Sequence, residues 1–106
     1  MRVLLDECVP HVLRHHMPGH QVVTVTFMGW NGIKNGALLA LMLANGFDVL
    51  LTVDKSMRYQ QNLLASGVGV IQLLAASNDP TDLIPLMPAA CTALAAIKPG
   101  DVVVIP

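Results

Sequence analysis

The chain has little charge and few cysteines. Only 12% of its 106 residues are charged, and 6 basic residues stand against 7 acidic ones. A disordered chain is excluded, because such chains are rich in charge and poor in apolar residues, whereas 54% of this sequence is hydrophobic. A small domain that binds nucleic acid by charge alone is excluded too, since it needs a clustered excess of lysine and arginine. The 2 cysteines form no C-x-x-C motif, which excludes a disulfide scaffold and is typical of a reducing compartment.

A long hydrophobic run is also missing, although the mean hydropathy is +0.60. A membrane-spanning helix needs about 18 or more apolar residues in a row, and the best run, Ala37–Ala44, stops at Asn45-Gly46. No secretory signal is visible at the N-terminus. We therefore expect a soluble, cytoplasmic protein with no membrane contact. Because few charges are present to cover the surface, we also expect a homo-oligomer, most simply a homodimer, with residues 82–97 as a candidate interface.

Strand-like and helix-like segments alternate along the sequence. The strand-like segments are residues 2–5, 21–26, 48–53, 68–73 and 101–105. The helix-like segments are residues 10–16, 36–44, 56–65 and 82–97, the last with a bend at Pro88, and residues 27–34 form a glycine-containing loop. Continuous apolar strands separated by helices predict a parallel sheet covered on both faces. We expect a single α/β domain over residues 1–106, a three-layer α/β/α sandwich with a doubly wound, mainly parallel, five-stranded sheet.

Two of the strand-like segments stop at an acidic residue. Asp6 and Glu7 follow the first strand, and Asp54 follows the third. Ligands bind at the carboxyl ends of the strands in such sheets. Carboxylates that converge there repel one another, and a hard cation such as Mg²⁺ or Mn²⁺ relieves that repulsion. The alternative is that Asp6 and Asp54 only cap the following helices or mark solvated strand ends, and position alone favours neither interpretation.

The residues around these acids resemble a known family. The sequence LLDECVP at residues 4–10, Gly19-His20 before the second strand and LLTVDK at residues 50–55 together resemble the motifs of small bacterial PIN-like proteins, relatives of the VapC-type toxin ribonucleases. The resemblance implies a hydrolase that cleaves single-stranded RNA with Mg²⁺ or Mn²⁺, and a protein antitoxin as partner. It also implies that Asp6 and Asp54 are catalytic and bind the metal, with Glu7 assisting.

The acidic cluster that the resemblance implies is incomplete in this chain. PIN domains carry about four acids, as two-metal phosphoryl-transfer sites do. No Asp or Glu lies between Thr26 and Phe47, where the second would stand, and Asn35 and Ala37 occupy that region. Asn78 and Asp79 are the candidates for the fourth. We therefore expect slow cleavage.

Basic and aromatic residues lie near the same predicted edge of the sheet. Lys34, Lys55 and Arg58 are candidates for contacts with RNA phosphates, and Trp30 is a candidate for stacking on an unpaired base. The alternative is that the cations only solubilise loops. The alternative for Trp30 is that its ring seals the core or an interface. The sequence favours this alternative, because large aromatic residues are usually well buried.

Two other functions fit parts of the pattern. A phosphoacceptor domain of the receiver type would share Asp6, Glu7 and Asp54, with Ser77 after the fourth strand. It would also carry a lysine after the fifth strand, whereas Lys98 precedes that strand. A non-catalytic interaction or nucleic-acid-binding subunit is favoured by the missing acid and the low charge.

Overall fold

Five short aliphatic segments form one sheet. β1 (Arg2–Leu5), β2 (Gln21–Thr24), β3 (Val49–Thr52), β4 (Gly69–Leu73) and β5 (Val102–Ile105) lie in the order β2-β1-β3-β4-β5. All four pairs of neighbours are parallel, so the predicted parallel sheet is confirmed. The computed structural model describes residues 1–33, 35–55 and 67–106.

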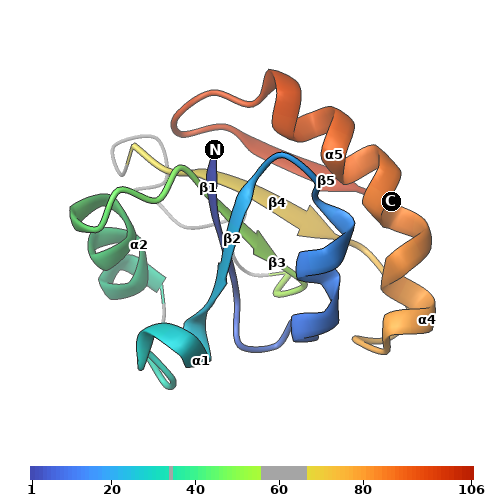
Figure 1. Ribbon diagram of the computed structural model, residues 1–106, viewed down its shortest axis with the longest axis horizontal. Coiled ribbons are helices and arrows are strands. Elements are labelled where there is room, and N and C mark those ends of the chain that lie inside the picture. Colours follow the sequence, from blue (N-terminus) through green and yellow to red (C-terminus); the bar gives the residue numbers. More distant parts are fainter. Residues whose placement is uncertain (34, 56–66) are drawn as a thin grey trace.

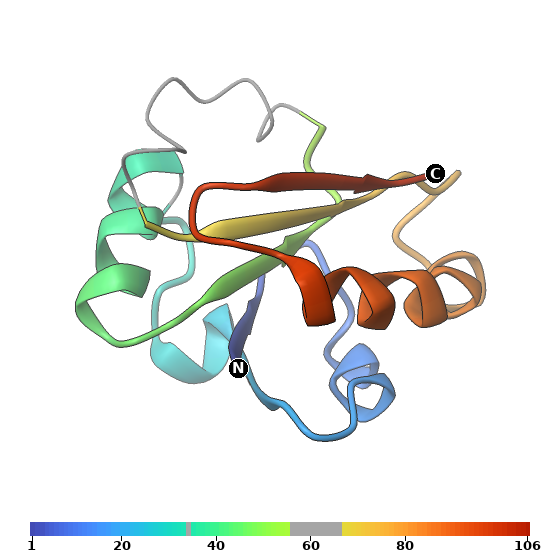
Figure 2. The ribbon, with the colours of Figure 1, turned by 90° about the horizontal axis from the view of Figure 1, so that it is seen from above.

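Helices cover both faces of the sheet (Figure 1, Figure 2). One face carries η1 (His11–His16), α4 (Pro80–Leu83), η3 (Ile84–Leu86) and α5 (Met87–Ala96), and the other carries α1 (Val25–Met28) and α2 (Asn35–Ala44). The two faces bury separate aliphatic clusters, one around Leu13 and Leu94 and the other around Leu38 and Leu50. The arrangement is the three-layer α/β/α fold that the alternation predicts.

The segment after β2 differs from the sequence prediction. The strand expected at residues 21–26 ends at Thr24, and the short helix α1 replaces the first part of the expected loop. The Thr24 hydroxyl accepts a hydrogen bond from the Phe27 N–H at 3.0 Å, which caps the helix. Gly29, with φ of 74°, ends it in the left-handed conformation that glycine adopts without steric cost.

Two of the predicted helices also differ in detail. The segment after Pro10 is a 3-10 helix, without a capping side chain or an acidic residue in its first turn. The long helix begins early at α4, and η3 separates it from α5. Pro85 lies in η3 and has no N–H to donate, whereas Pro88 stands in the first turn of α5, where none is needed. The break in the long helix therefore lies at η3, before Pro88, and not at Pro88 as the sequence predicts.

The other predicted elements agree or cannot be compared. The predicted helix 36–44 is confirmed as α2, and the strands at 48–53, 68–73 and 101–105 are confirmed within a residue or two at each end. The predicted helix 56–65 lies outside the described residues. Within the ranges that are described, no helix combines the length and the apolar character needed to cross a bilayer.

Candidate functional site

Asp6 lies just past the end of β1 and is held firmly. Its N–H donates to the Leu51 carbonyl oxygen at 3.0 Å, which extends the pairing of β1 with β3 by one residue. Its carboxylate accepts two hydrogen bonds, at Oδ1 from the Glu7 N–H at 2.9 Å and at Oδ2 from the Thr52 hydroxyl at 2.8 Å. An ionised carboxylate offers about four lone-pair sites, so the half-buried Asp6 keeps acceptor capacity for a ligand.

Thr52 connects the two acids that the sequence singled out. It is the last residue of β3 and is fully buried. Its hydroxyl donates to Asp6 and accepts from the N–H of Asp54 at 3.0 Å. Because β1 and β3 are neighbouring parallel strands, Asp6 and Asp54 follow adjacent strand ends, as the sequence predicts. Their catalytic role stays a prediction.

Glu7 and Asn78 connect the loop after β1, which carries Asp6, to two other segments. Glu7 is exposed, and its Oε1 accepts from the Gly32 N–H at 3.0 Å, which ties the loop after β1 to the glycine-containing loop. The Asn78 side-chain amide donates to the Cys8 carbonyl oxygen at 3.3 Å. Asn78, a candidate for the fourth acidic position, therefore lies beside the loop that carries Asp6 and Glu7.

Asp79, the other candidate for that position, serves a local purpose. Its Oδ1 accepts from both the N–H and the hydroxyl of Thr81, at 2.9 and 2.7 Å, and it caps α4. These hydrogen bonds, that from the backbone first, hold the pKa of Asp79 below its usual value. In the region of the missing second acid, Ala37 is exposed while Leu38 and Leu39 are buried.

The carboxyl end of the sheet carries a row of polar residues on the face that α2 covers. Thr52 of β3 aligns with Gln72 of β4, and Asp6 follows the pairing of Leu5 with Leu51. Two residues earlier on the same strands, this face is aliphatic, with Leu4, Leu50 and Val70 in one cluster. We refer to Asp6, Thr52 and Gln72 as the polar row. Gln72 is fully buried, and neither its amide nitrogen nor its amide oxygen has a hydrogen-bond partner among the described residues.

The polar row predicts opposite effects for two similar substitutions. Gln72→Leu should raise the free energy of unfolding by about 1–2 kcal/mol, because it replaces a buried amide that has no partner in the described part of the chain by an apolar side chain of similar volume. Thr52→Val should lower it by about 1–3 kcal/mol, because valine neither donates to Asp6 nor accepts from Asp54. Urea denaturation measures both changes, provided that the dependence of the free energy of unfolding on urea concentration has the same slope as in the wild type. A destabilised Gln72→Leu protein would mean that the amide has a partner when the protein is in solution.

Cys8 is not an activated thiol. It is half-buried, and its Sγ lies 3.9 Å from the Thr52 hydroxyl oxygen. Burial raises the pKa of Cys8, and the negative charge of Asp6 raises it further, against the lowering effect of the Val53 backbone. A raised pKa disfavours the thiolate, the reactive form of cysteine.

The predicted RNA-contacting residues occupy different surroundings. Trp30 is half-buried, and its ring packs edge to face against Phe47 with centroids 5.9 Å apart. That contact is the core-sealing role that the sequence favours for it. Lys55 is exposed beside Asp54. Lys34 and Arg58 lie outside the described residues.

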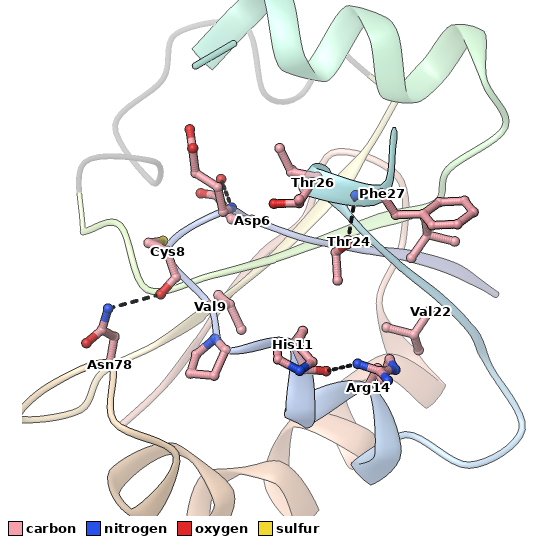
Figure 3. Close-up of a pocket in the computed structure, with 14 residues that line it drawn as sticks. Asp6, Cys8, Val9, His11, Arg14, Val22, Thr24, Thr26, Phe27 and Asn78 are labelled. Carbon is pink, nitrogen blue, oxygen red and sulfur yellow. Dashed lines mark hydrogen bonds between the residues drawn. The ribbon is translucent and has the colours of Figure 1, made fainter. Parts of the chain in front are cut away.

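A groove of about 790 Å³ opens between η1 and α1 (Figure 3). Asp6, Cys8 and Asn78 lie at one end, while His11 and Arg14 of η1 face Thr26 and Phe27 of α1 across β2. Phe27 was not predicted, because residues 25–28 were expected to be strand and loop and not the helix α1. Arg14 was not predicted, because it lies outside the motifs that stand out in the sequence. In the parts of the chain described, no three His, Cys, Asp or Glu side chains gather into a group able to hold a metal ion.

A comparison of the chain with models of protein families, with curated proteins and with solved structures finds no match. The resemblance to PIN-like proteins therefore depends on the motifs in the sequence. What the site can do is inferred from its own residues.

Proposed function

We propose that this chain is a PIN-like ribonuclease that binds a single divalent cation weakly and cleaves single-stranded RNA slowly. The observation that carries the proposal is the Thr52 hydroxyl, which joins the Asp6 carboxylate to the N–H of Asp54 at 2.8 and 3.0 Å. This buried hydroxyl orients the Asp6 carboxylate and anchors the backbone of Asp54. Both residues follow the ends of adjacent strands, where ligands of parallel sheets bind.

The donor set is suited to Mg²⁺ or Mn²⁺. Asp6 and Asp54 would hold the cation, since both ions prefer carboxylate oxygens and keep several waters. The two hydrogen bonds to Asp6 orient its carboxylate, as the partners of metal-binding carboxylates do. When bound, such a cation supplies a Lewis acid for the phosphoryl oxygens and generates a nucleophile from water.

The remaining residues would position the substrate. Glu7, whose carboxylate accepts from the Gly32 N–H, would assist by adding negative charge beside Asp6 and not as a ligand of the cation. Lys55, exposed directly after Asp54, would attract an RNA phosphate toward the acids. Lys34, Arg58 and Trp30 remain proposed RNA contacts on the strength of the sequence alone. The absence of any acid between Thr26 and Phe47 leaves fewer charges to offset the cation, and this is why cleavage should be slow.

Calorimetric titration with Mn²⁺ tests the metal site. The wild type should bind Mn²⁺ weakly, because only two carboxylates are proposed to hold the ion. The Asp6→Asn, Asp54→Asn double variant should show no binding heat. Equal heats for the two proteins would place any bound metal elsewhere and contradict the proposal.

A second candidate function is a non-catalytic interaction or nucleic-acid-binding subunit. It is favoured by the missing acid between Thr26 and Phe47 and by the low charge of the sequence. In that case the protein would bind RNA or a protein antitoxin without cleaving RNA.

Self-association also stays a proposal. The large side chains of α5, such as Met87 and Leu94, are buried in the chain's own core, and alanine and threonine side chains are exposed on its outer side. Light scattering at high micromolar concentration should still show a homodimer, and a monomer would contradict that expectation.

A further inference from the structure

Phe27 exposes an aromatic ring at the border of the groove. Its side chain is 81% exposed, the most of any large hydrophobic residue in the described ranges. The ring stands on a defined support, because the Phe27 N–H is bonded to the Thr24 hydroxyl and Gly29 closes α1 two residues later. Single exposed hydrophobic residues are common. This one differs because a cationic side chain from another segment lines the same groove.

Arg14 supplies that cation from the opposite side of β2. It is exposed on η1, and one of its five N–H donors is bonded to the His11 carbonyl oxygen at 3.2 Å. That bond holds the guanidinium against η1 and leaves its remaining donors for a ligand. Figure 3 shows η1 and α1 on either side of β2, with Val22 and Thr24 between them.

The two ends of the groove differ in charge. Arg14 and His11 line one part, while Asp6 and Glu7 line the other. A strand of RNA has a base face that can stack on an aromatic ring, and a phosphate that an arginine can bind through charge-assisted hydrogen bonds. The acids at the other end would repel a phosphate. The groove therefore favours one orientation of the strand, with the bound phosphate beside Arg14 and away from Asp6 and Glu7.

We propose that the groove between η1 and α1 binds an unpaired stretch of RNA, with a base stacked on Phe27 and a phosphate bound by Arg14. The inference rests on the proposed action on RNA and names the residues that hold the substrate. It requires single-stranded RNA, because a base inside a duplex has no free face for Phe27. The groove volume of about 790 Å³ lies in the range of about 300–1,000 Å³ that is usual for ligand sites.

Fluorescence anisotropy with a labelled oligouridine of about eight nucleotides, in EDTA, tests the subsite without any contribution from divalent cations. Phe27→Ala should weaken binding about 5- to 150-fold, the range that stacking of about one base provides. Phe27→Leu should weaken it as well, since it keeps an apolar side chain but no ring, and Phe27→Trp should restore it. Leu43→Ala, which shortens another exposed hydrophobic residue, is the matched control and should bind as the wild type does.

The phosphate contact has its own readout. Arg14→Gln should reduce the slope of log affinity against log salt by about 0.7, the value for one contact with a single strand. Arg14→Lys should keep that slope. Lys98→Gln removes an exposed cation between α5 and β5 and should leave binding unchanged.

Three results would overturn the subsite. The first is that the Phe27→Ala and Arg14→Gln proteins both bind RNA as tightly as the wild type does. The second is that the wild type binds no RNA, and the third is that it binds single-stranded and duplex RNA with equal affinity. A groove that instead takes up an extended peptide along the open edge of β2 would give the first of these. Because the titration contains EDTA, RNA binding in the groove and Mn²⁺ binding at the acids can each be found without the other. The two proposals are therefore tested separately.

Discussion

Replacing Asp6 and Asp54 together by asparagine should lower the metal-dependent cleavage of single-stranded RNA by more than about 100-fold. Loss of partners that only orient metal ligands costs about 10- to 100-fold, and the loss of the two ligands themselves should cost more. Asparagine keeps the shape of both side chains, but at position 6 its single oxygen can accept from Thr52 or from the Glu7 N–H and not from both. A small fall in the melting temperature is therefore expected, and the large loss should appear in the rate, measured with a fluorogenic single-stranded RNA in Mn²⁺ and in EDTA.

The matched control exchanges two other aspartates. Asp48 directly precedes β3 and Asp101 directly precedes β5, so both stand at the opposite end of the sheet. They accept backbone hydrogen bonds from Arg2 and Lys98. The Asp48→Asn, Asp101→Asn protein changes the net charge by the same amount and should cleave RNA as the wild type does. Equal cleavage rates for the wild type and the Asp6→Asn, Asp54→Asn protein would mean that the activity belongs to another site or to a contaminant.

Leu50→Ala should lower the free energy of unfolding by about 2–5 kcal/mol. Leu50 lies at the centre of β3, is fully buried, and packs in the cluster beneath α2. Removing its side chain takes away apolar contacts and leaves a cavity in a close-packed layer. Since a domain of this size is stable by about 5–15 kcal/mol, the melting temperature should fall by roughly 8 °C or more.

The control for that substitution is the same chemical change at an exposed position. Leu43 on α2 is 55% exposed, so Leu43→Ala should change the free energy of unfolding by about 0.5 kcal/mol or less. Equal melting temperatures for the Leu50→Ala and Leu43→Ala proteins would mean that β3 is not a central strand. That result would also remove the support beneath Thr52 and Asp54.

The fold could be predicted because its signals are local. Aliphatic runs such as Val49–Thr52 can only be buried on both faces, and the separating helices impose parallel strands. The order of the strands could not be predicted, because the residues of β2 carry no signal for pairing with β1 and not with the strand at the far edge of the sheet. The short helix α1 was missed because Val25 and Thr26 are β-branched and continue the strand pattern of β2. The bond between the Thr24 hydroxyl and the Phe27 N–H, which caps the helix, depends on the chain leaving the sheet there.

The site could be predicted only in part. Asp6 and Asp54 stand out because each follows an apolar run. The hydrogen bonds of Thr52 could not be predicted. Threonine is common in strands because of its β-propensity, so its presence there signals nothing special, and its partner Asp6 lies 46 positions away in the sequence. Gln72 was missed for a related reason. Its burial, with no hydrogen-bond partner among the described residues, follows from the packing of the neighbouring strands, which no local pattern encodes.

A crystal soaked with Mn²⁺ tests the central claim most directly, because the anomalous signal of manganese locates the ion without reference to activity. The account predicts one anomalous peak between the carboxylates of Asp6 and Asp54, with the Thr52 hydroxyl still bonded to Asp6, and no such peak in the Asp6→Asn, Asp54→Asn protein. Density for water alone between the two carboxylates at millimolar Mn²⁺, or a peak elsewhere in the molecule, would contradict it.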